Sequence, residues 1–116
     1  AYGATKAFDM VFAEALWSEL HDKGIDVIGL ILGKTNTPAL RRLEHSRGHL
    51  SSEDAAPADA DSVERVISEA FENLGNGPTL MVGEMMRNVA PILASLTRNE
   101  AVNLLTQAQA AAMGAD

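Results

Sequence analysis

Tyr2 and Lys6 are the two residues whose types and spacing best suit catalysis. They lie four residues apart, so on a helix both side chains project from the same face. A phenol with a pKa of about 10 exchanges protons poorly at neutral pH, but a nearby ammonium group stabilises the phenolate and lowers that pKa. The pair therefore predicts a general acid and base, and the lysine can also donate hydrogen bonds to a bound polyol such as a ribose. The same spacing also fits an ordinary amphipathic helix with exposed polar residues.

The residues that follow predict a helix, a tight turn and a buried strand. Apolar side chains recur at three- and four-residue steps from Tyr2 to about Lys23, which is the period of an α-helix. Gly24 follows in the position of a left-handed helix cap. The run from Ile25 to Leu32 is β-branched and becomes apolar on both faces, which is typical of a parallel strand covered by helices on both sides. Together these segments form half of a βαβ unit.

The rest of the chain is predicted to contain one further strand and several helices. The predicted elements are a loop over 33–37, a short helix from Pro38 to about Glu44, a mobile loop over 45–60, a helix over about 62–74, a strand over 79–82 and helices over about 84–96 and 99–113. Thr37 and Pro38 suit the N-cap and first residue of the short helix. Asp61 is the predicted N-cap of the next helix, with Glu64 completing a capping box.

The segment from Tyr2 to Phe8, Tyr-Gly-Ala-Thr-Lys-Ala-Phe, resembles the active-site segment of the short-chain dehydrogenase/reductase family. In that family the helix runs on to a Gly before a buried strand, and Gly24 and residues 25–32 follow here in that order. The family's strand ends in a Pro-Gly-x-x-x-Thr motif that wraps the nicotinamide, and this sequence has Leu32-Gly-Lys-Thr-Asn-Thr37. Leu32 departs from the family's Pro and restores a backbone N–H. Two motifs in register are much more specific than either alone.

The resemblance implies roles for five residues. Tyr2 would be the general acid in carbonyl reduction and the general base in alcohol oxidation, while Lys6 would lower its pKa and hold the nicotinamide ribose. The backbone of Gly33 and Thr35, with the hydroxyl of Thr37, would orient the carboxamide and so select the ring face that transfers hydride. The implied cofactor is NAD or NADP, and the implied substrate is a ketone or a secondary alcohol.

The resemblance also implies an α/β fold, with this chain as the C-terminal part of a Rossmann-type doubly wound parallel sheet. Residues 1–116 would belong to a single NAD(P)-binding domain, to which they supply two strands and their helices. Residues 38–60 would form a lid over the substrate. The intact enzyme is expected to form a homodimer or homotetramer, because family members commonly pair the helix that begins at Tyr2 with its counterpart in a second subunit.

The length of the chain predicts a fragment. Its 116 residues are about half of what such an enzyme needs, and the sequence runs from Ala1 directly into a helical pattern. The family's Gly-rich phosphate-binding turn, ribose selector, catalytic Ser and supporting Asn all lie N-terminal to the Tyr, whereas the only glycine before residue 24 is Gly3. The choice between NAD and NADP and the identity of the substrate therefore stay open, and we expect the piece alone to be inactive.

Composition argues against several other classes of function. The net charge is −7, and the Arg41-Arg42 pair is too short to meet nucleic acid or an anionic membrane. There is no cysteine, which excludes disulfides and thiolate metal sites and is compatible with the cytoplasmic location that we expect. No apolar run approaches the roughly 20 residues of a membrane span. The three histidines lack the paired spacing of a zinc site, so no metal is expected.

A non-catalytic function is the main alternative. The chain would then be an inactive truncated fragment or an interaction module that keeps the family's scaffold. With most of the sheet missing, the strand over 25–32 would expose an unpaired edge and apolar faces, which invites association. Three methionines near the second strand could line a substrate pocket, but their predicted use is to fill gaps in the core. They are Met81, Met85 and Met86.

Overall fold

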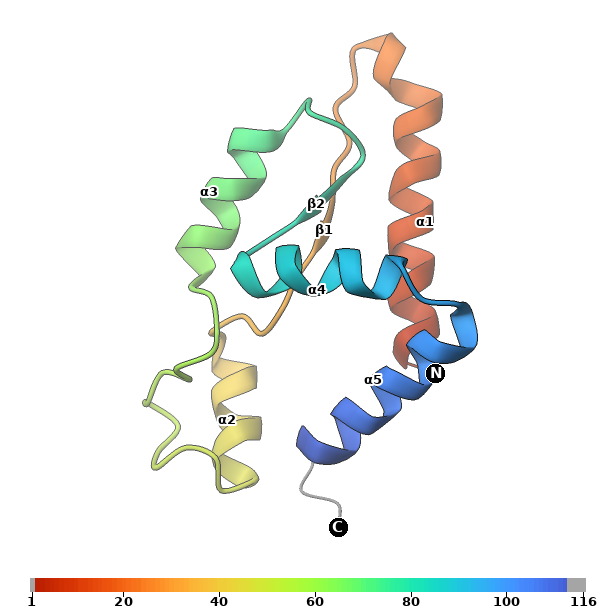
Figure 1. The fold of residues 1–116 in the computed structure, drawn as a ribbon. Coiled ribbons are helices and arrows are strands. Elements are labelled where there is room, and N and C mark those ends of the chain that lie inside the picture. Colours follow the sequence, from red (N-terminus) through yellow and green to blue (C-terminus); the bar gives the residue numbers. More distant parts are fainter. Residues whose placement is uncertain (1, 113–116) are drawn as a thin grey trace. The chain divides into compact units, whose positions relative to one another are not determined.

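The computed structural model describes the backbone of residues 2–112 and the side chains of residues 3–111 (Figure 1). The chain divides into two compact units, with the boundary between Met86 and Arg87. The first unit contains a parallel strand pair with its helices, and the second is helical. This arrangement confirms an α/β fold that is compatible with part of a Rossmann sheet.

Helix α1 spans Tyr2–Leu20 and continues into a 3-10 turn over His21–Lys23. The turn ends at Gly24, whose φ of 76° lies in the left-handed region that favours glycine. The predicted helix and its glycine cap are therefore confirmed. The final turn tightens to 3-10 geometry, which satisfies terminal carbonyls that an α-helix leaves unpaired.

Strands β1 (Gly29–Ile31) and β2 (Thr79–Met81) form a parallel pair in which Gly29 lies opposite Thr79. The prediction of a strand over the whole of 25–32 was too long. In the described part of the chain, β1 pairs only with β2, which has three residues, so the ladder cannot extend further. Leu30 and Leu32 are 37% and 43% exposed, which agrees with the expectation that this strand exposes apolar surface where most of the sheet is missing.

Helix α1 packs on the strands through a close approach of small residues. A Cβ placed on Gly29 would lie only 3.0 Å from the Cβ of Ala13 and 3.4 Å from the carbonyl oxygen of Pro78. In Figure 1, α1 and α3 (Val63–Asn73) flank the two strands. The most deeply buried apolar side chains are Val82, at 1% exposure, and Val66 of α3, at 7%.

Helix α2 spans Pro38–Ser46 and begins where predicted. The N-cap of α3 lies one residue later than predicted, because Ser62 rather than Asp61 accepts a hydrogen bond from the Arg65 backbone N–H, at 3.1 Å. The backbone of Asp61 forms an isolated parallel bridge with Thr35. Its carboxylate instead lies 3.5 Å from the Arg65 guanidinium.

The remaining helices are α4 (Glu84–Ala94) and α5 (Arg98–Ala112), close to their predicted limits. The predicted last residue of α5, residue 113, lies outside the described residues. Thr97 and Glu100 form a reciprocal cap at the start of α5, with the Thr97 backbone N–H donating to Glu100 Oε2 at 2.8 Å. Hydrogen bonds from Thr97 hold the pKa of the Glu100 carboxyl below its ordinary value.

Gly29→Ala is expected to lower the free energy of unfolding by about 1–3 kcal/mol, because the added methyl group overpacks the contact between α1 and β1. Adding Ala13→Gly makes room for that methyl group, so the two losses in free energy should not add. Chemical denaturation of both single variants and the double variant measures this coupling. Gly3→Ala is the matched control, since its Cβ would meet nothing within 4 Å. Additive losses would contradict the proposed packing.

Candidate functional site

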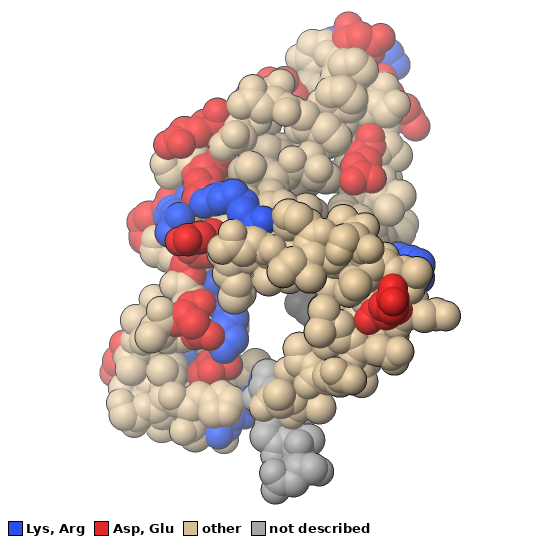
Figure 2. Space-filling view, viewed as in Figure 1, with Lys and Arg blue, Asp and Glu red and all other residues tan. Residues whose placement is uncertain are grey.

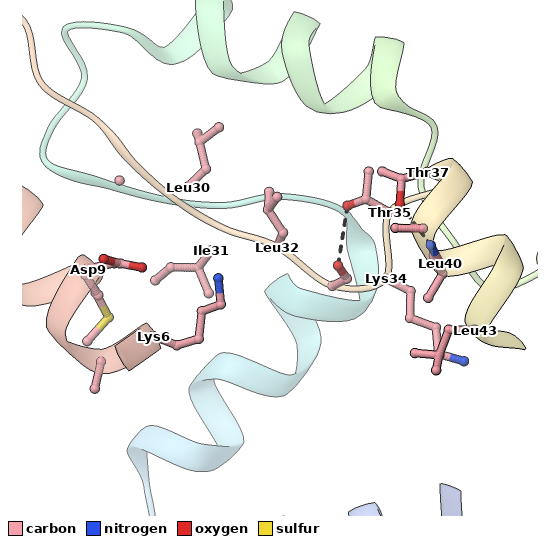
Figure 3. A pocket seen from close by; sticks show the side chains of 15 residues that line it. Lys6, Asp9, Leu30, Ile31, Leu32, Lys34, Thr35, Thr37, Leu40 and Leu43 are labelled. Atoms are coloured by element: carbon pink, nitrogen blue, oxygen red, sulfur yellow. Dashed lines mark hydrogen bonds between the residues drawn. The ribbon is translucent and has the colours of Figure 1, made fainter. Parts of the chain in front are cut away.

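A cavity of about 860 Å³ lies among the N-terminal half of α1, β1, the loop over 33–37 and α2. Its size falls within the range of small-molecule sites. Most of its wall is apolar and comes from Met10, Leu30, Ile31, Leu32, Leu40 and Leu43. Lys6, Asp9 and Lys34 add charged groups to an otherwise hydrophobic lining, and Figure 3 shows them around the end of β1.

Four of the five predicted site residues line this one cavity. Lys6 comes from α1, whereas Gly33, Thr35 and Thr37 come from the loop after β1. Figure 3 shows the Lys6 side chain extending beside Ile31, the last residue of β1. Tyr2 is the first residue of α1, one turn before Lys6, and its side chain lies outside the described residues. The packing of α1 on β1 thus brings together residues that are far apart in the sequence.

Short-range hydrogen bonds shape the loop on its way to α2. Thr35 Oγ1 donates to the carbonyl oxygen of Gly33 at 3.4 Å, and Thr37 Oγ1 accepts from the backbone N–H of Leu40 at 3.2 Å. Thr37 is therefore the N-cap of α2, as predicted, with Pro38 in its first turn. A threonine hydroxyl that accepts a hydrogen bond keeps its own O–H to donate elsewhere. The cap therefore leaves Thr37 able to bind a ligand in the cavity.

Asp61 fixes the backbone of the same loop. Its N–H donates to the carbonyl oxygen of Lys34 at 2.9 Å, and its carbonyl oxygen accepts from the N–H of Asn36 at 2.8 Å. This isolated parallel bridge acts like a very short additional strand. Sequence reasoning missed it because Asp61 also fits the pattern of an N-cap, and no local pattern reveals a partner so distant in the sequence.

A charged cluster lies where Lys34 meets α2 and the segment after it. Lys34 Nζ lies 3.0 Å from Asp59 Oδ2 and 3.7 Å from Glu44 Oε2, and His49 Nδ1 lies 3.1 Å from that same glutamate oxygen. The hydrogen bond with Asp59 is the main cause that raises the pKa of Lys34 and lowers that of Asp59. Sequence analysis assigned no site role to these four residues, because they have no diagnostic spacing.

The methionines lie behind the loop rather than in the cavity wall. A Cβ on Gly33 would lie 3.2 Å from Met85 Cε and 3.5 Å from Met86 Cγ. Neither methionine lines the cavity, and neither does Met81, which pairs with Ile31 in the sheet. Met81 and Met86 are partly buried and Met85 is 50% exposed, so the methionines do not fill gaps in a buried core as predicted. A side chain at position 33 would make its tightest contact with the end of Met85.

Within residues 3–111, no group of three or more His, Cys, Asp or Glu side chains could hold a metal ion. No helix in the described part of the chain is long and apolar enough to cross a membrane. On the face that Figure 2 draws, basic side chains are interspersed with acidic ones rather than gathered into a basic patch.

Sequence comparison finds curated relatives that share part of their length with this chain. The chain is 38% identical over 91 residues to a 7beta-hydroxysteroid dehydrogenase of Mediterraneibacter gnavus, a match of 78% of this chain and 33% of the relative. The protein of the same name from Collinsella aerofaciens is 37% identical over 83 residues, which cover 72% of this chain and 30% of the relative. The protein of that name from Clostridium sardiniense is 31% identical over 101 residues, which cover 87% of this chain and 36% of the relative.

The chain therefore spans about one-third of the length of the curated relatives it matches. No family model matches the chain. The solved structures gave no significant match.

Asp59→Asn removes the charge that faces Lys34. Near neutral pH the free energy of unfolding should fall by about 0.2–1 kcal/mol, as is typical of solvent-exposed ion pairs. The larger values of a buried pair do not apply, because 63% of the Asp59 side chain is exposed. Chemical denaturation of the wild-type and variant proteins measures the difference, and Glu53→Gln serves as a control for loss of an exposed carboxylate from the same segment.

The difference in free energy of unfolding between the wild-type protein and Asp59→Asn should depend on pH in a defined direction. The pKa of Asp59 is lowered in the folded protein. Its contribution is therefore present above the ordinary aspartate pKa of about 3.9 and is lost as the pH falls through the folded value. The pKa of Lys34 is raised, so its contribution is lost only as the pH rises through a value above about 10.4. A stability difference that persists in strong acid would contradict this assignment.

Proposed function

We propose that this chain, which belongs to the short-chain dehydrogenase/reductase family, is the C-terminal catalytic part of a nicotinamide-dependent oxidoreductase. The proposed reaction is hydride transfer between NAD or NADP and a ketone or secondary alcohol in the protein that contains this segment. One observation carries the proposal: Lys6, Gly33, Thr35 and Thr37 line a single cavity. The family relationship was found from the sequence, whereas this juxtaposition comes from the fold.

The cavity has the chemistry to accept the nicotinamide half of the cofactor. An ammonium group from Lys6 suits the ribose hydroxyls, and the hydroxyl of Thr37 with the loop backbone suits the carboxamide. Ile31 and Leu32 provide an apolar surface for the ring. The bound cofactor would supply or accept the hydride.

The residues of this chain would then move and hold a proton. In carbonyl reduction the phenol of Tyr2 would donate a proton to the substrate oxygen as hydride arrives at carbon, and in alcohol oxidation the phenolate would take it back. Lys6 lies one turn further along α1, where its ammonium group would stabilise the phenolate. The loop over 33–37 would act by positioning, because it holds the reacting ring at a fixed distance and angle.

We further propose a hydroxysteroid as the substrate. The relatives from three bacterial species carry the name 7beta-hydroxysteroid dehydrogenase. In this chain, Met10 of α1 and Leu40 and Leu43 of α2 extend the cavity with apolar surface. A fused hydrocarbon ring system would bury its surface against such a wall, and each Å² of apolar area removed from water contributes about 25 cal/mol. Residues 38–60 would cover this substrate as a lid.

Several expectations from the sequence stay predictions. They are the single NAD(P)-binding domain over 1–116, the homodimer or homotetramer of the intact enzyme and its cytoplasmic location. The choice between NAD and NADP depends on the adenosine half of the site. No residue of this chain is assigned to that half.

Tyr2→Phe in the full-length enzyme is expected to abolish turnover, because it removes the proton donor and acceptor while keeping the ring. Cofactor affinity should change by less than about threefold, since positioning of the nicotinamide depends on other groups. Steady-state rates and the quenching of protein fluorescence by reduced cofactor measure the two effects. Tyr2→Phe with unchanged turnover would show that another residue transfers the proton.

The isolated 116-residue chain is expected to be inactive, and its exposed apolar surface supports the alternative of an association module. Phe8 and Phe12 stack with ring centroids 5.5 Å apart, yet they are 65% and 51% exposed. Monomers rarely leave contiguous apolar surface uncovered. The chain is mixed with reduced cofactor and a panel of ketones, and cofactor oxidation is followed by absorbance. Oxidation above background would contradict the expected inactivity.

A further inference from the structure

We propose that Arg41 and Glu44 of α2 are positioning residues that hold the loop over 33–37 in the geometry needed to orient the nicotinamide. This inference rests on the proposed function, because it assigns a purpose to the loop only if the loop binds that cofactor. Neither residue lines the cavity, so neither is placed to touch the ligand. Their proposed action is indirect and passes through Asn36 and Lys34.

Glu44 is a charged side chain in an unusual position. It is 6% exposed, and it is the one polar or charged side chain that is buried among the described residues. Burial of a carboxylate is costly unless hydrogen bonds or opposite charges compensate it. Here compensation comes from two directions, with His49 Nδ1 at 3.1 Å and Lys34 Nζ at 3.7 Å from Oε2. The buried charge thus joins α2 to the loop and to the segment that follows α2.

Arg41 makes a second connection of the same kind. Its Nη1 donates to Asn36 Oδ1 at 3.0 Å, and its Nε donates to the backbone carbonyl oxygen of Glu53 at 3.0 Å. Arg41 and Glu44 are three residues apart and therefore lie on neighbouring positions of one helix face. A planar guanidinium with donors at fixed angles suits two acceptors that must keep a constant relative position.

The two connections reach alternate residues of the loop. Lys34 and Asn36 are anchored by their side chains to α2 and by their backbones to Asp61, whereas Gly33, Thr35 and Thr37 are the proposed cofactor contacts. Anchoring every second residue of an extended segment fixes the direction of the residues between them. A loop held in this way would orient the carboxamide without reorganisation when the cofactor binds.

The same two residues also connect the loop to the proposed lid. Glu53, whose carbonyl accepts from Arg41, and His49, which contacts Glu44, both belong to the segment over 38–60. Arg41 and Glu44 lie in that segment too, so the loop over 33–37 is anchored directly to the proposed lid. A conformational change in the lid would alter the conformation of the loop over 33–37 through these hydrogen bonds, without contact with the substrate.

The test uses Glu44→Gln and Arg41→Lys in the full-length enzyme. Each variant should raise the KM for the cofactor and lower kcat/KM by about 10-fold, because small displacements of a positioning group have large kinetic effects. The KM for the steroid or ketone should change much less. Glu64→Gln and Arg98→Lys are matched controls, since they make the same chemical changes at exposed residues outside the loop and the proposed lid.

A stereochemical readout separates positioning from a loss of stability. Reduced nicotinamide deuterated on one face transfers deuterium or hydrogen according to the orientation of its ring, and mass spectrometry of the product measures the ratio. Arg41→Lys should lose part of the facial selectivity of the wild-type enzyme although its thermal unfolding midpoint matches that of its control, whereas Glu44→Gln should lose selectivity together with some stability. If Glu44→Gln fails to fold, Arg41→Lys alone decides, because it changes a partly exposed side chain and keeps its charge.

Two results would overturn the inference, and they are distinguishable. An active wild-type enzyme whose two variants keep the cofactor KM and facial selectivity of the controls would show that the anchors do not position the loop, and the proposed function would stand. A wild-type enzyme with no nicotinamide-dependent turnover on any ketone or alcohol would overturn the proposed function together with the inference.

Discussion

The close approach of α1 to β1 is the contact on which the candidate site depends. Because position 29 has no side chain, the helix can lie against the strand at the distance set by the Ala13 methyl group. That distance decides where Lys6 stands relative to the loop that leaves the end of β1. A larger residue at either position would move the helix bearing the proposed proton-transfer pair away from the segment proposed to hold the cofactor. Packing at the middle of α1 therefore controls geometry near its beginning.

The loop after β1 achieves order without belonging to a regular sheet. Its backbone pairs with Asp61, its side chains reach α2, and its last residue caps that helix. Each of these bonds is worth only about 1 kcal/mol, so no single one would hold a loop of this length against its conformational entropy. Their combined effect is to fix successive residues from different directions. Such order suits a segment that must orient a planar ring rather than enclose it loosely.

The parts of this structure that sequence could predict are those decided locally. The helix ending at Gly24 and the cap at Thr37 follow from residue types within a few positions, and both are present. The length of β1 and the start of α3 could not be predicted in the same way. The first depends on how many residues β2 offers for pairing, and the second on which of two adjacent capping residues, Asp61 or Ser62, is used.

The candidate site also has a part that the sequence predicts and a part that only the fold reveals. Its five residues could be named because two short motifs carry them, whereas the contacts of Glu44 and Arg41 involve partners with no characteristic spacing. A single glutamate near the end of the helix over 38–46 leaves no signal in hydrophobic periodicity. Only the fold shows that this side chain faces the loop instead of the solvent.

The parallel pairing of Gly29 with Thr79 also has a consequence for how the protein folds. Everything between the two strands, including α2 and α3, must be confined before the first ladder bond forms, and this gives the sheet a high contact order. Helix α1 can form early from local contacts, whereas β1 can pair only after β2, which lies far along the chain, has come into place. The entropy lost on closing so large a loop grows only with the logarithm of its length. Changes in the length of the segment between α2 and α3 would therefore alter the folding rate far less than changes to the strands themselves.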